Sequence, residues 1–178
     1  MQKKLRLATA WLDGCSGCHM SLLDMDESII ELANKIELVY SPLVDYKFNE
    51  IPNTIDVTLV EGAIGNDHDL KELHTLRDKS KLLIALGDCA VTGNIPSIRN
   101  CFKSKSILNR VYIENTNYNP QIPNEDIPKL VNVLPLHHVV KVDLFVQGCP
   151  PPSSNIQLVL TELLDRRTPD LKGKQKFG

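Results

Sequence analysis

Four of the five cysteines in the 178-residue chain stand in contexts that favour metal binding. Cys15 and Cys18 form a Cys-x-x-Cys pair, whereas Cys89 and Cys149 are isolated and each follows a glycine by one or two residues. Four thiolates at one place suit a 4Fe–4S cluster or a structural zinc ion. Zinc sites of this type usually contain two closely spaced pairs, and the proline after Cys149 resembles the end of some ferredoxin motifs. The pattern therefore favours the iron–sulfur cluster and leaves a zinc-stabilised interaction module as an alternative.

The Cys-x-x-Cys pair taken alone fits two other chemistries. A dithiol between a strand and a helix, with a tryptophan nearby, is typical of thioredoxin-like enzymes, but this interpretation leaves Cys89 and Cys149 unexplained. Together with His19, the pair also spells the Cys-x-x-Cys-His haem attachment motif. Covalent haem attachment normally requires export, and the N-terminal residues do not resemble an export signal. We therefore expect His19 to be an ordinary residue in the first turn of a helix.

Other residues that could do chemistry have competing structural explanations. Glu61 ends a predicted strand at the same edge as the cysteines, where it is equally well explained as a turn carboxylate or as a proton-handling group beside the metal. Cys101 lies in a predicted helical segment, and free cysteines are commonly buried as small apolar residues, so we expect a structural role for it. His137 and His138 are adjacent, and adjacent residues of a strand face opposite ways, so we expect core or surface positions rather than a metal pair.

Short apolar runs alternate with helical patterns along the chain. Strands are predicted at residues 5–11, 36–40, 56–61, 82–86 and 143–147. Helices are predicted at residues 19–35, from a cap at Asp67 onward, and at residues 153–167. This alternation indicates an α/β fold with an open, doubly wound parallel sheet. Loops that follow parallel strands emerge at one edge of the sheet, so we expect the four cysteines to converge there.

The length of the chain predicts a single domain over residues 1–167. Four prolines and many asparagines in residues 109–141 predict a long irregular insertion before the last strand. The lysine-rich residues 168–178 are expected to form a flexible tail.

The composition argues against two classes of partner. Lys and Arg number 20 against 22 Asp and Glu, a net charge of −2, so the chain has no basic surplus with which to bind a nucleic-acid backbone. Aromatic residues make up only 5% of the chain, which leaves few platforms on which bases could stack. No stretch approaches the roughly 20 apolar residues of a membrane span, so we expect no direct membrane insertion and a cytoplasmic location. In a reducing compartment the cysteines are better explained as metal ligands than as disulfides.

Four motifs, in their order along the chain, together resemble the small subunit of nickel–iron hydrogenases. They are Cys15-x-x-Cys18, Glu61-Gly62-Ala63-Ile64, Gly87-Asp88-Cys89-Ala90-Val91-Thr92-Gly93 and Gly148-Cys149-Pro150-Pro151. The resemblance covers about residues 5–165, and in length the chain resembles the short cytoplasmic form found in bidirectional, NAD(P)-linked hydrogenases. Some members of the family have Gly-Gly where this chain has Gly93-Asn94.

The resemblance implies a flavodoxin-like fold and an electron-transfer subunit of a hydrogen:NAD(P)+ oxidoreductase. It implies that Cys15, Cys18, Cys89 and Cys149 bind one proximal 4Fe–4S cluster and that this chain has no catalytic residue of its own. The nickel–iron centre that splits dihydrogen is then expected in a separate large subunit. Diaphorase subunits that carry FMN and further clusters are expected to pass the electrons to NAD(P).

A related family shares part of the pattern. The cluster-bearing 20 kDa-type subunit of respiratory complex I resembles the chain in its last two cysteine motifs, but its first two cysteines are adjacent. Here two residues separate Cys15 from Cys18, which favours the hydrogenase. A complex I-like subunit or an energy-converting membrane hydrogenase remains the alternative.

Overall fold

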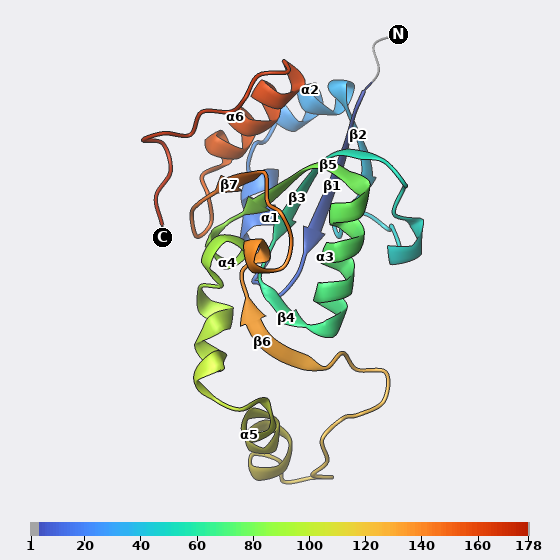
Figure 1. Cartoon of the computed structure of the whole chain (residues 1–178), viewed down its shortest axis with the longest axis vertical. Coiled ribbons are helices and arrows are strands. Elements are labelled where there is room, and N and C mark those ends of the chain that lie inside the picture. The colour runs from blue at the N-terminus through green and yellow to red at the C-terminus, as the bar shows by residue number, and fades with distance from the viewer. Residues whose placement is uncertain (1–3, 178) are drawn as a thin grey trace.

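A sheet of five parallel strands, in the order β2-β1-β3-β5-β7, forms the centre of the computed structural model, which describes residues 4–177 (Figure 1). Its strands are β1 (Leu5–Trp11), β2 (Ile36–Tyr40), β3 (Ile55–Glu61), β5 (Ser80–Leu86) and β7 (Leu144–Val146). When only these strands are counted, the order is the 2-1-3-4-5 of flavodoxin-like proteins. The predicted α/β fold class is therefore confirmed.

Helices lie on both faces of the sheet. The α-helices are α1 (Gly17–Leu23), α2 (Ser28–Lys35), α3 (Asp67–Lys79), α4 (Asp88–Thr92), α5 (Ser104–Asn109) and α6 (Ser153–Leu164). The 3-10 and π-helical segments are η1 (Phe48–Glu50), η2 (Ile95–Cys101), η3 (Arg110–Glu114) and η4 (Leu136–His138).

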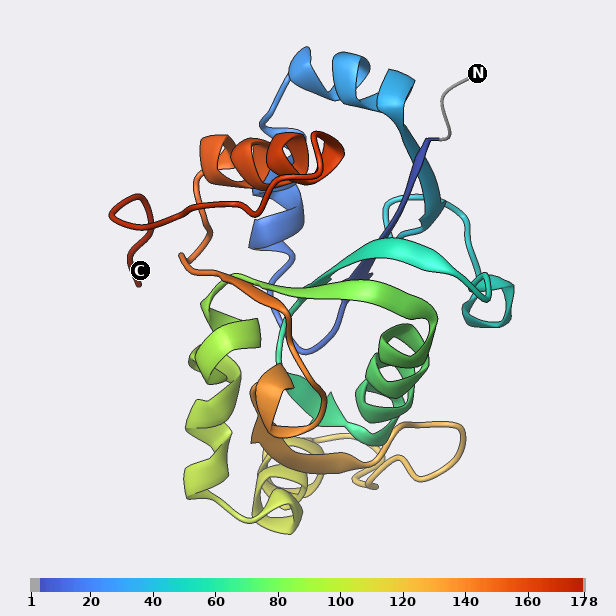
Figure 2. The ribbon, with the colours of Figure 1, turned by 45° about the horizontal axis from the view of Figure 1, so that its top comes forward.

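Two apolar cores hold these layers together. Most residues of the central strands β3 and β5 are buried, as expected where both faces of a parallel sheet are covered. One core joins the sheet to α3 and α4, and the other joins it to α1, α2 and α6 (Figure 2). The carboxyl ends of the strands are therefore held at a fixed edge between the two helical layers.

The predicted single helix over residues 19–35 is wrong, because the chain turns between α1 and α2. Residues 24–27 form this turn, and Asp26 adopts a left-handed backbone conformation with φ of 48°. Met25 is buried within the turn, so an apolar residue appears at helical spacing although no helix passes through it.

The start of α3 also differs by one residue from its prediction. Asn66, rather than Asp67, caps the helix, because its side chain accepts hydrogen bonds from the backbone N–H groups of His68 and Asp69 at 2.9 and 3.0 Å. The Asp69 side chain accepts in return from the backbone N–H of Asn66, which completes a capping box.

The stretch before the last strand contains a strand that the sequence pattern did not predict. Residues 115–129 have neither helix nor strand, but β6 (Leu130–Leu134) pairs antiparallel with β4 (Ile64–Asn66) in a second, small sheet. Arg99 in η2 donates to the carbonyl oxygens of Val131 and Gly65, and thereby ties both strands to η2.

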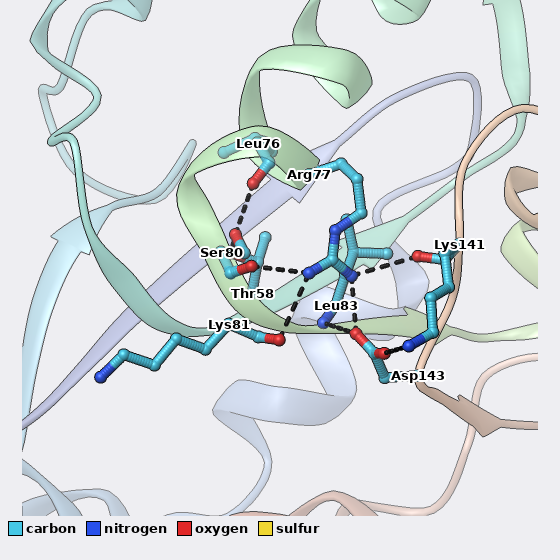
Figure 3. A network of polar contacts seen from close by, with 8 residues as sticks. All are labelled: Thr58, Leu76, Arg77, Ser80, Lys81, Leu83, Lys141 and Asp143. Atoms are coloured by element: carbon cyan, nitrogen blue, oxygen red, sulfur yellow. Dashed lines mark hydrogen bonds and ion pairs between the residues drawn. The ribbon is translucent and has the colours of Figure 1, made fainter.

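The amino edge of the sheet is fixed by a polar network around Arg77 of α3 (Figure 3). The Arg77 guanidinium donates to the Asp143 carboxylate at 2.6 Å and to the carbonyl oxygen of Ser80 at 2.6 Å. Asp143 also accepts from the backbone N–H of Leu83 at 2.9 Å, and its other oxygen lies 3.3 Å from Lys141 Nζ. These contacts join α3, β5 and the segment that enters β7.

The segment after α6 folds back against the body of the protein. Leu171 is buried in the core on the α6 side of the sheet, and Asn155 in α6 donates to the carbonyl oxygen of Lys174 at 2.9 Å. The flexibility expected of residues 168–178 stays a prediction. Among the helices of residues 4–177, none combines the length and the apolar character needed to cross a bilayer.

Candidate metal centre

The four predicted cysteines all follow strands of the central sheet at its carboxyl edge. Cys15 and Cys18 come after β1, with Cys18 in the first turn of α1. Cys89 lies in α4 directly after β5, and Cys149 lies in the loop after β7. Strands β2 and β3 lie on opposite sides of β1, so the Cys-x-x-Cys loop sits where the strand order reverses, the usual place for a site in this type of fold.

Close contacts through glycine bring the cysteine segments together. Gly17 lies between the Cys15 thiol and the Pro150 ring, since a Cβ atom on it would stand 3.2 Å from Cys15 Sγ and 3.9 Å from Pro150 Cβ. A Cβ atom on Gly87 would collide with Cys18 Sγ and would stand 3.5 Å from the Gly148 carbonyl oxygen. The segments that carry the four cysteines are therefore neighbours in space.

The loop that carries Cys149 is anchored to the start of α4. The backbone N–H of Asp88 donates to the Gly148 carbonyl oxygen at 2.9 Å, and the Gly148 N–H donates to the Asp88 carboxylate at 2.7 Å. Asp88 is buried, so this pair of bonds is shielded from water. Because Asp88 precedes Cys89 and Gly148 precedes Cys149, the pair fixes two of the cysteines relative to one another.

Glu61, at the end of β3, anchors the Cys-x-x-Cys loop through hydrogen bonds to its backbone. Its carboxylate accepts hydrogen bonds from the backbone N–H groups of Cys18 and His19 at 3.3 and 2.9 Å. The side chain of Ser16, the residue before α1, makes no capping bond, so Glu61 satisfies N–H groups of the first turn in its place. Glu61 is thus a structural anchor of the loop, whichever further role it has.

His19 is a site residue that the sequence reasoning missed. Its Nδ1 lies 2.5 Å from Glu61 Oε2, and both side chains are almost completely buried. Among the buried side-chain nitrogen and oxygen atoms of residues 4–177, His19 Nε2 alone lacks a hydrogen-bond partner. The Cys-x-x-Cys-His motif was a signal for His19, but the motif's usual haem interpretation gave no reason to pair it with Glu61.

The remaining candidates lie elsewhere. Cys101 was expected to have a structural role because free cysteines are commonly buried, but its burial is wrong: Cys101 ends η2 with an exposed side chain. His137 and His138 are both exposed, which agrees with the expected core or surface positions, but they lie in the helical turn η4 and their expected placement on a strand is wrong. A short helical turn after proline produced this difference, because it breaks the alternation assumed for a strand.

Burial and the neighbouring negative groups disfavour the thiolate form of the cysteines at this centre. Burial, then the Glu61 carboxylate and the other three cysteines, raises the pKa of Cys18 far above its usual range. Burial, followed by Cys149, Cys15 and Glu61, raises the pKa of Cys89 to about 11, although the backbone N–H of Ile95 acts in the opposite direction. The positive charge of a bound metal would stabilise such sulfurs as thiolates.

The donor set fits an iron–sulfur cluster in its chemistry. Cysteine thiolates are the usual ligands of such clusters, and the glycines at positions 17 and 87 leave room beside the sulfurs. Over residues 4–177, no group of three or more His, Cys, Asp or Glu side chains is gathered tightly enough to hold a single metal ion.

The centre is open to its surroundings. Cys15 and Cys149 are exposed, Cys89 is half-buried and Cys18 is buried. A pocket of about 340 Å³ opens beside Cys149, and its other wall is formed by residues 173–176 of the tail. A larger pocket of about 750 Å³ lies at the opposite, amino edge of the sheet and is lined by none of the four cysteines.

Comparison with known proteins finds similarity along almost the whole chain. Residues 15–163 match the family described as NADH ubiquinone oxidoreductase, 20 Kd subunit. The chain is 44% identical over 166 residues to a vhu subunit of the F420-non-reducing hydrogenase of Methanocaldococcus jannaschii, in an alignment that covers 92% of this chain and 57% of that protein. It is 38% identical over 174 residues to the delta subunit of the NAD-reducing hydrogenase HoxS of Cupriavidus necator, in an alignment that covers 94% of this chain and 82% of that protein.

A solved structure is similar in both fold and sequence. A chain in the crystal structure of an NAD+-reducing [NiFe]-hydrogenase in the H2-reduced state superposes with a TM-score of 0.92 and 35% identity, over 98% of each chain. By contrast, the chain spans only about half the length of the archaeal F420-non-reducing hydrogenase subunits that it matches.

Proposed function

Because this chain belongs to the family of the 20 kDa subunit of NADH ubiquinone oxidoreductase, which it shares with subunits of hydrogenases, we propose that it is the electron-transferring small subunit of a nickel–iron hydrogenase that reduces NAD(P). The observation that carries the proposal is the meeting of four cysteines from three strand ends at one edge of the sheet. The similarity to the NAD+-reducing [NiFe]-hydrogenase chain supports the choice of nicotinamide as the acceptor.

In this proposal Cys15, Cys18, Cys89 and Cys149 hold one 4Fe–4S cluster. When bound, the cluster supplies one-electron transfer between the nickel–iron centre of a large subunit and the flavin of diaphorase subunits. No residue of this chain makes or breaks a bond of the substrate. The tasks of the chain are to fix the four sulfurs, to control the water around them and to present them to the partner.

The structure of the edge suits these tasks. Glu61 and Asp88 hold the backbone beside Cys18 and Cys149 through buried hydrogen bonds, so the ligand loops are positioned before any metal arrives. The exposed Cys15 and Cys149 leave the edge open, and the exposed Trp11 lies beside it at the end of β1. We assign this edge as the surface on which the large subunit docks, in a cytoplasmic assembly.

A second candidate acceptor has support in the sequence comparison. The chain is 44% identical to the vhu subunit of an F420-non-reducing hydrogenase and 38% identical to the subunit of the NAD-reducing one, and the first name specifies no nicotinamide acceptor, which supports a small subunit with another acceptor. The two candidates share the cluster and the large subunit, and they differ in the further subunits and in the final acceptor.

The test is to purify the chain without oxygen together with its bound partners. About four iron atoms and four acid-labile sulfides in this chain are expected, together with hydrogen-dependent reduction of NAD or NADP. Cys89→Ser should abolish that reduction while nickel stays in the large subunit, whereas Cys101→Ser, at the exposed cysteine outside the edge, should change neither. One zinc per chain without sulfide would overturn the cluster, and hydrogen-dependent reduction of an artificial dye but of neither nicotinamide would favour the second acceptor.

A further inference from the structure

Asn94 reaches the candidate centre from a backbone conformation that asparagine seldom adopts. It follows α4 with φ of 30° and ψ of −129°, in the region that favours glycine. Its side-chain Nδ2 lies 3.5 Å from Cys149 Sγ, although the two residues are 55 positions apart in the sequence.

The surrounding structure holds Asn94 in this conformation. Its carbonyl oxygen accepts hydrogen bonds from both the backbone N–H and the hydroxyl of Ser97, at 3.1 and 2.7 Å. Its backbone N–H donates to the Thr92 hydroxyl at 3.3 Å. A residue in a sparsely populated conformation persists only where neighbouring contacts fix it in this way, and such residues concentrate at functional sites.

The protonation state of the Cys149 sulfur determines which atom of the Asn94 amide faces it. A cysteine that holds iron is a thiolate and has no proton to donate, so only the NH2 end of the amide can bond to Cys149. The next residue, Ile95, directs its backbone N–H toward Cys89. The turn between α4 and η2 thus supplies donors to two of the four sulfurs.

We propose that Asn94 is a positioning residue that acts through Cys149 to raise the reduction potential of the cluster above that of an otherwise identical chain with glycine at this position. Reduction adds one electron and makes the sulfurs more negative, so a donor to sulfur stabilises the reduced state more than the oxidised state. This inference rests on the proposed function, because it requires the cluster.

The test measures the midpoint potential of the cluster in the oxygen-free complex. Dithionite supplies the electron, and the reduced cluster is followed by electron paramagnetic resonance, its signal being the one that Cys89→Ser removes. Asn94→Gly should lower the midpoint by about 59 mV, which is a tenfold change in the equilibrium constant of a one-electron couple. Asn119→Gly is the control, because Asn119 also has a positive φ, of 46°, and is exposed within the stretch before β6, so its substitution changes a second asparagine of positive φ and should leave the midpoint unchanged.

Two further variants keep the test decisive. Asn94→Asp fills the same space without an N–H donor and should also lower the midpoint. Ser97→Ala removes the hydroxyl that holds the Asn94 carbonyl, and it should lower the midpoint by less than Asn94→Gly does. Because this variant keeps Asn94, it can be measured even where a change at position 94 prevents cluster assembly. An unchanged midpoint in Asn94→Gly, or in Ser97→Ala where that variant alone assembles, would overturn the role of Asn94. Absence of iron and sulfide from the unaltered chain would instead overturn the proposed function.

Discussion

The imidazole of His19 and the carboxylate of Glu61 form a buried pair, with Nδ1 and Oε2 2.5 Å apart. The same carboxylate accepts the backbone N–H groups of Cys18 and His19, so one side chain from β3 connects the sheet to the first turn of α1. The Cys-x-x-Cys loop is therefore fixed by the neighbouring strand and not by its own capping residue.

Replacing this carboxylate should loosen the loop. We expect Glu61→Gln to lower the free energy of unfolding by about 1–3 kcal/mol, because an amide presents one acceptor oxygen to three donors and leaves a buried group unsatisfied. Denaturant titration of the purified protein measures the change, and Glu27→Gln, at an exposed glutamate, serves as the control. A variant as stable as the unaltered protein would show that the bonds to Glu61 do not anchor the loop.

The order of the elements could be predicted because each central strand carries its own signal. The runs that became β1, β2, β3 and β5 are five to seven residues long and rich in apolar residues, which is the usual signal of buried parallel strands. By contrast, β6 alternates in burial and gains its strand character from pairing with β4, which is distant in sequence. The turn between α1 and α2 was missed for a similar reason, since Met25 is buried by tertiary contacts.

The candidate site, like the fold, could be predicted only in part. The convergence of the four cysteines followed from the rule that loops after parallel strands share an edge. The roles of His19 and Asn94 did not follow, because each depends on a partner more than 40 residues away. The sulfur that Asn94 faces is identified only by the fold, which brings the loop after α4 beside the loop after β7.

Gly87 should be necessary for metal binding. A side chain there would collide with Cys18 Sγ, and the residue has φ of 84°. We expect Gly87→Ala to reduce the iron content of the purified chain at least twofold. Gly173→Ala is a matched control, since Gly173 has φ of 72° but no atom within 4 Å of the added Cβ, so it carries the backbone strain without the collision. Equal iron in the two variants would contradict a steric role for Gly87.

The thiol of Cys89 should titrate late in the metal-free chain. Burial, followed by Cys149, Cys15 and Glu61, raises the pKa of Cys89 from 9.0 to about 11, so at pH 9 the folded protein keeps this thiol largely protonated while the unfolded chain has lost about half of the protons. Alkylation of Cys89 with iodoacetamide, read by peptide mass spectrometry, should rise between pH 9 and 11 in the folded chain and about two units earlier in urea.

The same shift has a consequence for stability. A raised folded-state pKa contributes stability that is complete below pH 9 and is lost as the pH rises toward 11. Cys89→Ser should flatten this part of the stability profile. An alkylation profile that is identical with and without urea would contradict the effect of burial and neighbouring sulfurs.

Asp143 should make the fold sensitive to acid without affecting the metal centre. Partial burial raises the pKa of Asp143, but hydrogen bonds from Leu83, Arg77 and Lys141 outweigh it, so the pKa lies below its usual value of 3.8. A depressed carboxyl pKa contributes stability that is present above pH 3.8 and is lost as the pH falls further. Asp143→Asn should therefore reduce the stability at neutral pH and weaken its dependence on pH below 4, as measured by denaturant titration.

Arg77→Lys tests the other half of this contact. Lysine cannot reproduce the fork through which Arg77 contacts Asp143 and the carbonyl oxygen of Ser80, so we expect a loss of about 1–3 kcal/mol in the free energy of unfolding. Because the network joins α3, β5 and the entry to β7 at the amino edge, the iron content should stay equal to that of the unaltered protein. Iron loss at unchanged stability would show instead that the two edges of the sheet are coupled.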